Sequence, residues 1–150
     1  MTDIAIVWDP IRMRGDWAIA NGDLQAGNDL ETAVLVSLFT DRVLPDDQTP
    51  PDGTNDRRGW WADTFTGTPI GSRLWTLRRA VKSNAALVLK QARDMCAEAL
   101  QWLIDDGVAG SIAISTAWIT PTTLGIAIEI TAPTGGLLGA FNYSWAWSRL

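Results

Sequence analysis

The chain has 150 residues, 47% of them hydrophobic and 19% charged, with a formal net charge of −5 at pH 7. This composition predicts one folded domain that needs no disulfide or metal to hold it together. The acidic balance argues against a general binder of nucleic-acid backbones, which carries a basic stripe. Because the chain has no histidine, imidazole-based catalytic triads and the usual histidine-ligated zinc sites are excluded.

An N-terminal β-hairpin is the first predicted element. Ile4 and Ile6 alternate with their neighbours, and the run at residues 16–20 leads into Asn21-Gly22. That dipeptide tolerates the positive φ angles that a type I′ turn requires. The first residues show no basic stretch followed by a long apolar run, so we expect no secretory signal and residence in a cytoplasm.

A first helix is predicted from about Asp29 to Thr40, because apolar residues recur there at helical spacing. Asn28 stands three residues before Glu31. This arrangement resembles a capping box, in which two side chains satisfy the free N–H groups at the start of a helix.

A long connection without apolar periodicity follows, from Pro45 to Gly71, and Pro and Gly interrupt it repeatedly. Structureless loops of this length are uncommon inside compact domains and are usually functional or disordered. The part at about residues 45–56 is acidic and lacks aromatic residues, so we expect it to be mobile. Order is expected to begin near Arg57.

Two further helices are predicted after the loop. Ser72 is suited to cap a short helix that ends at Ala80, and Ser83 to cap a longer helix that runs to Asp105. Gly107 is suited to end the longer helix in the left-handed conformation. An apolar stripe on this helix predicts that it packs on a sheet, and its members are Val88, Ala92, Met95, Ala99 and Leu103.

The last third of the chain predicts the sheet. Residues alternate with period two from Ile112 to Trp118 and from Leu124 to Ile130, around a turn at residues 121–123. The same alternation speaks against membrane spans in these uncharged stretches. A further strand places four aromatic side chains on one face, namely Phe141, Tyr143, Trp145 and Trp147.

These elements together predict an α+β fold in a single domain over residues 1–150. Its mainly antiparallel sheet carries two to three helices packed on one face, with an N-terminal β-hairpin and a long central loop.

Paired carboxyl groups can catalyse a reaction without imidazole, as in glycoside hydrolysis, where they lie about 5 to 9.5 Å apart. The candidates are Glu98, Asp105, Asp106 and Glu129. Their positions are typical of a helix rim, a helix end and an outward strand position, where solvated carboxylates are common. The single Cys96 lies in a helical pattern and is interpreted as a small buried hydrophobe. We therefore expect no catalytic residue, no metal and no cofactor.

The first candidate surface is the arginine- and tryptophan-rich end of the long loop, since Trp and Arg contribute most energy to protein contacts. Indole and guanidinium groups also stack on single-stranded bases, but such grooves need a continuous basic track. Here Asp56 and Asp63 flank the cluster, which favours pairing with carboxylates. Binding a partner and locking the chain's own loop both remain open for this set, which comprises Arg57, Arg58, Trp60, Trp61, Arg73 and Trp75.

The aromatic strand is the second candidate surface. At a sheet edge, its backbone and its rings would offer a template for a strand of a neighbouring chain. Alternatively, the rings fill the core opposite the long helix. Alternation alone does not choose between these interpretations of Phe141, Tyr143, Trp145 and Trp147.

Several blocks in the chain resemble, in the same order, the Mu-type phage tail protein family. This family is related to the baseplate wedge and sheath-initiator proteins of contractile tails and is sometimes labelled lysozyme-like. The similarity covers about residues 16–130. The blocks are DW at 16–17, DLETAV at 29–34, LFTDR at 38–42, RRGWW at 57–61, GSRLW at 71–75 and EALQWL at 98–103.

The resemblance implies a small α+β baseplate component that sits in several symmetry-related copies around the tail tube. It implies binding to larger wedge proteins and a strand on which the first sheath ring builds. The expected partners are wedge, tube and sheath proteins, with no nucleic acid and no membrane insertion. The expected location is the virion tail baseplate, assembled in the host cytoplasm.

Two family features are missing from this chain. Related wedge proteins carry a Glu-Pro-Arg motif after a Trp near the end of the main helix, whereas Trp102 is followed here by Leu103 and Ile104. That contact is therefore not transferred. No muramidase motif matches either, so the lysozyme-like label has no support. A structural baseplate protein is the resulting hypothesis, and a peptidoglycan-cleaving enzyme and a soluble regulatory adaptor are the alternatives.

Overall fold

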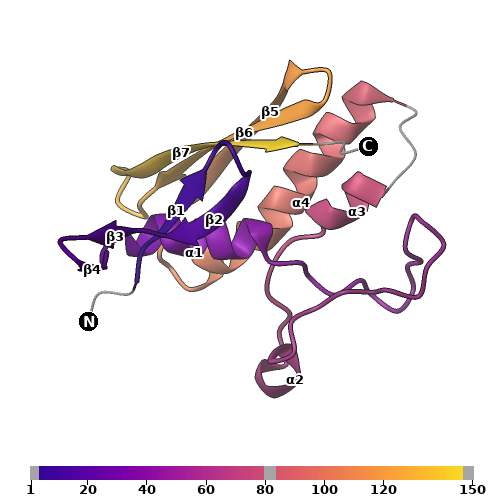
Figure 1. The fold of residues 1–150 in the computed structure, drawn as a ribbon, viewed down its shortest axis with the longest axis horizontal. Coiled ribbons are helices and arrows are strands. Elements are labelled where there is room, and N and C mark those ends of the chain that lie inside the picture. The colour runs from indigo at the N-terminus through magenta and orange to yellow at the C-terminus, as the bar shows by residue number, and fades with distance from the viewer. Residues whose placement is uncertain (1–3, 80–83, 147–150) are drawn as a thin grey trace.

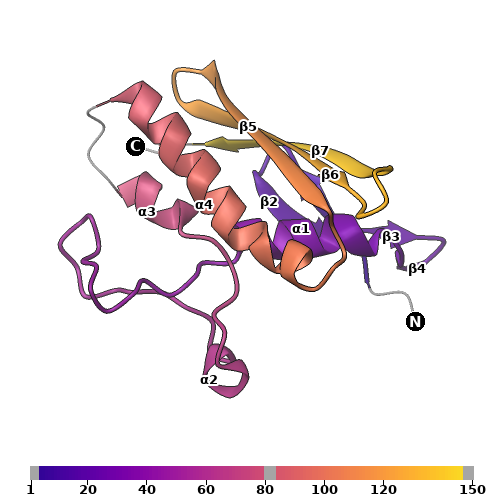
Figure 2. The ribbon, with the colours of Figure 1, turned by 180° about the vertical axis from the view of Figure 1, so that it is seen from behind.

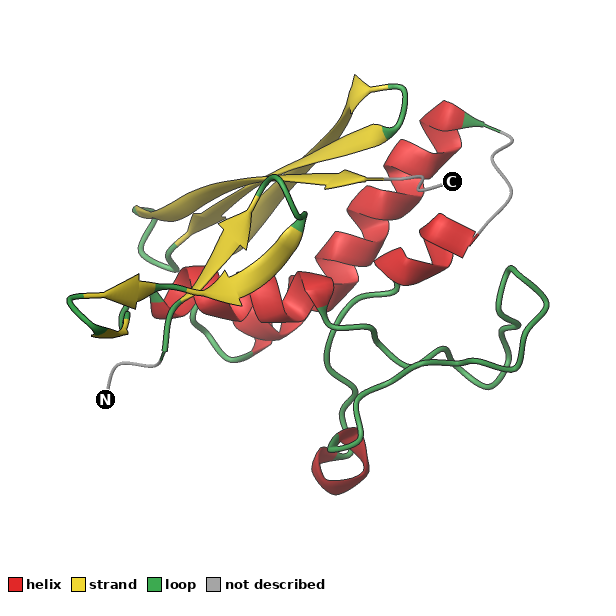
Figure 3. Cartoon of the chain, viewed as in Figure 1, coloured by secondary structure: helices red, strands yellow, loops and turns green. Residues whose placement is uncertain are grey.

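A computed structural model describes residues 4–79 and 84–146. Short strands come first, helices follow, and three long strands end the described chain, as Figure 3 shows. The predicted α+β fold is confirmed. The elements are β1 (Ile6–Asp9), β2 (Arg14–Trp17), β3 (Ile19–Ala20), β4 (Asp23–Leu24), α1 (Asp29–Phe39), α2 (Asp63–Thr66), α3 (Leu74–Arg79), α4 (Ala85–Asp105), β5 (Ser111–Thr120), β6 (Thr123–Thr131) and β7 (Leu137–Ala146).

Two short antiparallel hairpins open the fold, β1 with β2 and β3 with β4. Asn21 and Gly22 connect β3 to β4 with φ angles of 55° and 83°. Both values are positive, as a type I′ turn requires. The predicted N-terminal hairpin is confirmed, and the structure has two short hairpins where the sequence pattern predicted one.

The main sheet has the antiparallel order β5-β6-β7, and helices α1 and α4 lie along it (Figures 1 and 2). The middle strand β6 buries Ile126, Ile128 and Ile130 in a core shared with both helices. Glu129 of the same strand is exposed. The period-two pattern therefore predicted the buried face of β6 correctly.

Helix α4 is the main cover of the sheet. Its predicted stripe is largely buried, and Cys96 and Leu100 widen it, whereas Met95 is only half-buried. Burial raises the pKa of the Cys96 thiol to about 12, so the thiol stays protonated and acts as a small hydrophobe. Gly107 follows the helix with φ 74°, the left-handed conformation expected of it.

Three helix starts were predicted, and the structure corrects the details of two. Asn28 precedes α1, but its φ of 65° turns its side chain from the helix N–H groups, and its amide bonds to the Glu31 carboxylate instead. The N-cap of α4 is Asn84, whose Oδ1 accepts from the N–H groups of Ala86 and Leu87 at 3.0 and 3.2 Å. Ser83, the predicted cap, lies outside the described residues.

The third start, at α3, uses the predicted cap. Ser72 Oγ accepts a hydrogen bond from the Leu74 N–H at 3.3 Å. Ala80, the predicted last residue, lies outside the described residues. In the described part of the chain, no helix combines the length and apolar character needed to cross a bilayer.

Candidate functional site

The strands and the helices α1, α3 and α4 form what we call the body. The chain between α1 and α3 leaves the body and returns to it at one point. Arg42 N–H donates to the Ser72 carbonyl at 3.0 Å, and Ser72 N–H donates to the Thr40 carbonyl at 2.9 Å. A Cβ at Gly71, where φ is 96°, would collide with that Thr40 carbonyl. Only glycine allows the two ends to approach so closely. We call residues 40–72 the excursion, and Figure 1 shows it projecting beside the helices.

Arg57 closes the first half of the excursion. Its guanidinium donates to the carbonyls of Leu44 at 2.9 Å and Gln48 at 3.0 Å, and also to that of Pro45. The Leu44 N–H donates in turn to the Arg57 carbonyl at 2.9 Å. One side chain therefore gathers three backbone acceptors, which fits the fixed donor geometry of guanidinium.

Trp75, a buried residue of α3, anchors the excursion to the helices. Its indole N–H donates to the Arg42 carbonyl at 2.9 Å. The guanidinium carbons of Arg58 and Arg79 lie 5.9 and 5.0 Å from its ring centroid, within cation–π range. The ring therefore meets two cations that also contact the excursion's carboxylates.

Those two cations form a small ion-pair network. Arg58 lies 2.9 Å from Asp41 and 3.1 Å from Asp56. Arg79 lies 2.8 Å from Asp56 and 3.2 Å from Asp52. The hydrogen bond from Arg79 is the main reason why the pKa of Asp56 is lowered, and it raises the pKa of Arg79 in return. Asp56 and Arg79 therefore stabilise each other's charged forms.

Arg73 links the excursion to α4. Its Nε donates to the Glu98 carboxylate at 2.8 Å, and its Nη1 donates to the Gln48 side chain at 2.9 Å. Glu98 was one of the candidate catalytic acids, and the structure gives it a cationic partner.

Trp60 and Trp61 differ from the other four predicted residues in their contacts, because their rings lie against other aromatic rings. Both are exposed, and Trp61 is 76% exposed. Phe65 of α2, 80% exposed, joins them: ring centroids lie 5.7 Å apart for Trp60 and Trp61 and 6.2 Å apart for Trp61 and Phe65. We call these three residues the aromatic cluster. Sequence reasoning missed Phe65, although it is the next aromatic residue after Trp61, four positions further along the chain.

The predicted set of six therefore divides. Arg57, Arg58, Arg73 and Trp75 make contacts within the chain, and Trp60 and Trp61 present rings to solvent.

The aromatic strand β7 combines both of its predicted placements. It pairs with β6 alone among the described strands, so its other edge is open. Yet Tyr143 is buried, with its ring centroid 5.7 Å from those of Trp8 and Phe39, and Phe141 is half-buried against the same core. Trp145 pairs with Leu124 in the strand register, and Trp147 lies outside the described residues.

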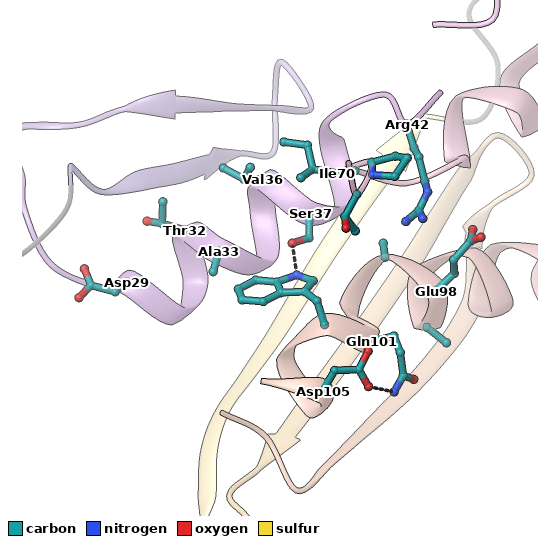
Figure 4. Close-up of a pocket in the computed structure, with 16 residues that line it drawn as sticks. Asp29, Thr32, Ala33, Val36, Ser37, Arg42, Ile70, Glu98, Gln101 and Asp105 are labelled. Carbon is teal, nitrogen blue, oxygen red and sulfur yellow. Dashed lines mark hydrogen bonds between the residues drawn. The ribbon is translucent and has the colours of Figure 1, made fainter. Parts of the chain in front are cut away.

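An open cavity of about 800 Å³ lies between α1, residues 68–71 and α4 (Figure 4). Trp102 donates its indole N–H to Ser37 Oγ at 3.0 Å across it. Asp105, another candidate acid, accepts from Gln101 at 3.0 Å. No group of three potential metal ligands occurs among the residues that the structure describes.

Comparison with known proteins identifies the family. The model of the family "Phage protein GP46" matches residues 30–136. The chain is 41% identical over 147 residues to "Baseplate protein gp46" of Escherichia phage Mu, covering 95% of this chain and 99% of the relative. It is 33% identical over 148 residues to "Mu-like prophage FluMu protein gp46" of Haemophilus influenzae, covering 97% and 99%. The predicted resemblance is confirmed, and the chain belongs to the phage protein GP46 family, a Mu-type phage baseplate family.

Proposed function

We propose that this protein is a structural component of the baseplate of a contractile phage tail or tail-like particle. The observation that carries the proposal is the similarity over almost its whole length to the baseplate protein of phage Mu. A relative of that kind supports a role in assembly over an enzymatic one. The protein would then reside in the tail baseplate of the virion, after assembly in the host cytoplasm.

The finer part of the proposal concerns partners. Several copies around the tail tube bind wedge proteins, and each copy helps to initiate the sheath by accepting a sheath strand on β7. The open edge of β7 supports this role, because its unpaired backbone groups are a template for another strand. Tyr143 and Phe141 tie β7 to the core, so the edge is held in place before a partner arrives.

The baseplate role is tested by deleting the gene in the phage and supplying it from a plasmid. We expect no infectious particles without the plasmid, and with it we expect the protein in purified tails, detected by mass spectrometry. Normal tails in its absence would refute the proposal.

The β7 role calls for a gentler change than truncation, since removing Tyr143 would damage the core. A photo-crosslinking residue at Asn142, exposed on β7, should capture the sheath protein during assembly. The same residue at Ile11, in the turn between β1 and β2, is the control. Equal capture from both positions, or none from Asn142, would contradict strand addition.

A further inference from the structure

We propose that the aromatic cluster of Trp60, Trp61 and Phe65 is a knob that docks into an apolar socket, bordered by basic side chains, on a different baseplate protein. This inference rests on the proposed function and gives it a specific contact surface.

The first support is the exposure of large apolar side chains to solvent. None of the four residues of α2 is buried, and Trp61 and Phe65 keep about three quarters or more of their surface in water. Burying such apolar surface is favourable, and the described part of the chain leaves it uncovered. Trp is also the residue type most enriched among interface residues that dominate binding.

The second support is rigidity at the base of the knob. The Asp63 carboxylate accepts from the N–H of Trp60 at 3.3 Å and of Ile70 at 3.1 Å. Thr64 Oγ donates to the Trp61 carbonyl at 3.1 Å, and Gly67 ends α2 with φ 69° and an N–H that donates to the Asp63 carbonyl. The backbone that carries the rings is therefore held in place before binding, which lowers the entropy cost of docking.

The third support is the attachment of the excursion to the body. Arg58 and Arg79 pair with three of its carboxylates beside the Trp75 ring. If the rings of the aromatic cluster served only to stabilise the chain's own fold, they would pack inward. The ion pairs of Arg58 and Arg79 instead stabilise a conformation of the excursion in which the rings of the aromatic cluster are exposed.

Charge indicates the kind of partner. Figures 1 and 2 show α2 and the arm at residues 45–56 projecting from the same side of the body, away from the main sheet. On that arm the Asp46 side chain is fully exposed, although 3.6 Å from Arg57, and Asp47 is exposed as well. A partner covering this side meets rings and carboxylates together, so basic groups beside its socket complement them.

The same charges argue against two other occupants. An anionic membrane would repel the exposed carboxylates of the arm. A second copy would bring another net charge of −5, and the cavity between α1 and α4 is lined by three acidic residues, Asp29, Glu98 and Asp105, against one basic residue, Arg42. A different protein with a basic rim is therefore the favoured partner.

The test is co-expression of the tagged protein with each other tail protein of the same phage, followed by kinetic measurement of the pair that binds. We expect W61A/F65A to weaken binding about 10- to 100-fold, mainly through faster dissociation. I11A/I19A is the matched control, because it also removes two exposed apolar side chains and should leave binding unchanged. Both variants should unfold at the wild-type temperature, since all four side chains are exposed.

A second variant tests the predicted rim. D46N/D47N should slow association several-fold at low salt and flatten its dependence on ionic strength, with little effect on dissociation. An unchanged association rate would contradict the proposal that basic side chains border the socket.

Three outcomes would overturn the knob. One is that W61A/F65A binds with wild-type affinity and enters particles as efficiently as the wild type does. This result would leave the baseplate function intact. Another is flotation of the wild type, but not the variant, with phosphatidylcholine–phosphatidylglycerol vesicles. The last is a dimer in sedimentation that W61A/F65A abolishes. Absence of the wild type from particles would instead overturn the proposed function itself.

Discussion

The body of the protein and its excursion are held by different forces. In the body, α4 and β6 bury apolar side chains such as Leu100 and Ile128 almost completely. In the excursion, residues 40–72, guanidinium groups bond to carbonyls and carboxylates, while Trp61 and Phe65 lie in water. The body is therefore stabilised by apolar burial and the excursion by polar contacts that salt and pH can weaken.

This difference matches two tasks. A close-packed core tolerates little change and keeps the edge of β7 in place. A polar-tied excursion opens locally at a smaller free-energy cost than the body, and it can carry apolar rings that the body would bury. The following predictions test whether the two regions respond separately, beginning with the largest effect.

Leu100→Ala should lower the free energy of unfolding by about 3 kcal/mol, because it leaves a cavity where α4 meets the sheet. Urea titration monitored by circular dichroism measures the loss. Ile119→Ala, at an exposed position of β5, is the control and should cost less than about 0.5 kcal/mol. A small effect at Leu100 would mean that α4 does not carry the core.

Arg57→Ala should cost about 1 to 2 kcal/mol, because the carbonyls of Leu44 and Gln48 lose a charged donor. The larger effect should be local: limited proteolysis between residues 45 and 56 should accelerate while the body stays folded. Arg14→Ala removes an exposed pair with Asp16 and should leave cleavage unchanged. Uniform acceleration over the whole chain would instead show that excursion and body open together.

Tyr143→Phe should leave stability unchanged or raise it by up to about 1 kcal/mol, because the buried hydroxyl has no hydrogen-bond partner within the described structure. Thermal unfolding measures the change. A loss of more than about 1 kcal/mol would show that the hydroxyl has a partner, for instance a bound water.

Acidification should loosen the excursion before the body. The pKa of Asp56 is lowered from 3.8, mainly by the hydrogen bond from Arg79. The stabilisation that Asp56 gives to the folded excursion is therefore fully present above pH 3.8, and it is lost as the pH falls through the lowered pKa of the folded state. The expected effect is faster proteolysis of residues 45–56 below about pH 4. In Arg79→Gln, which removes the cation, cleavage should already be fast at neutral pH and should change little on acidification.

Much of the body followed from local patterns. The period-two runs predicted β5 and β6, the apolar stripe predicted that α4 packs on the sheet, and Asn21-Gly22 predicted its turn. These predictions succeed because one buried face imposes one spacing on one segment. The helix caps were less predictable, since Asn28 adopts a left-handed φ that the capping pattern does not reveal.

The candidate site was predicted in composition but not in arrangement. The pattern picked out Arg57, Trp61 and Trp75 as one set, without indicating which would contact the chain itself. It also missed Arg79 and Phe65, which complete the ion-pair network and the aromatic cluster. A loop has no periodicity, so its contacts with distant residues leave no local signal.

The sequence by itself determined the fold class, the strand and helix patterns, the absence of imidazole chemistry and the family, because each depends on local spacing, composition or ordered blocks. Only the tertiary structure decided that β7 is an edge strand with rings in the core, and that Trp75 is enclosed while Trp61 is exposed. The physical reason is that both outcomes depend on contacts between segments far apart in the chain, where two residues of the same type acquire opposite environments.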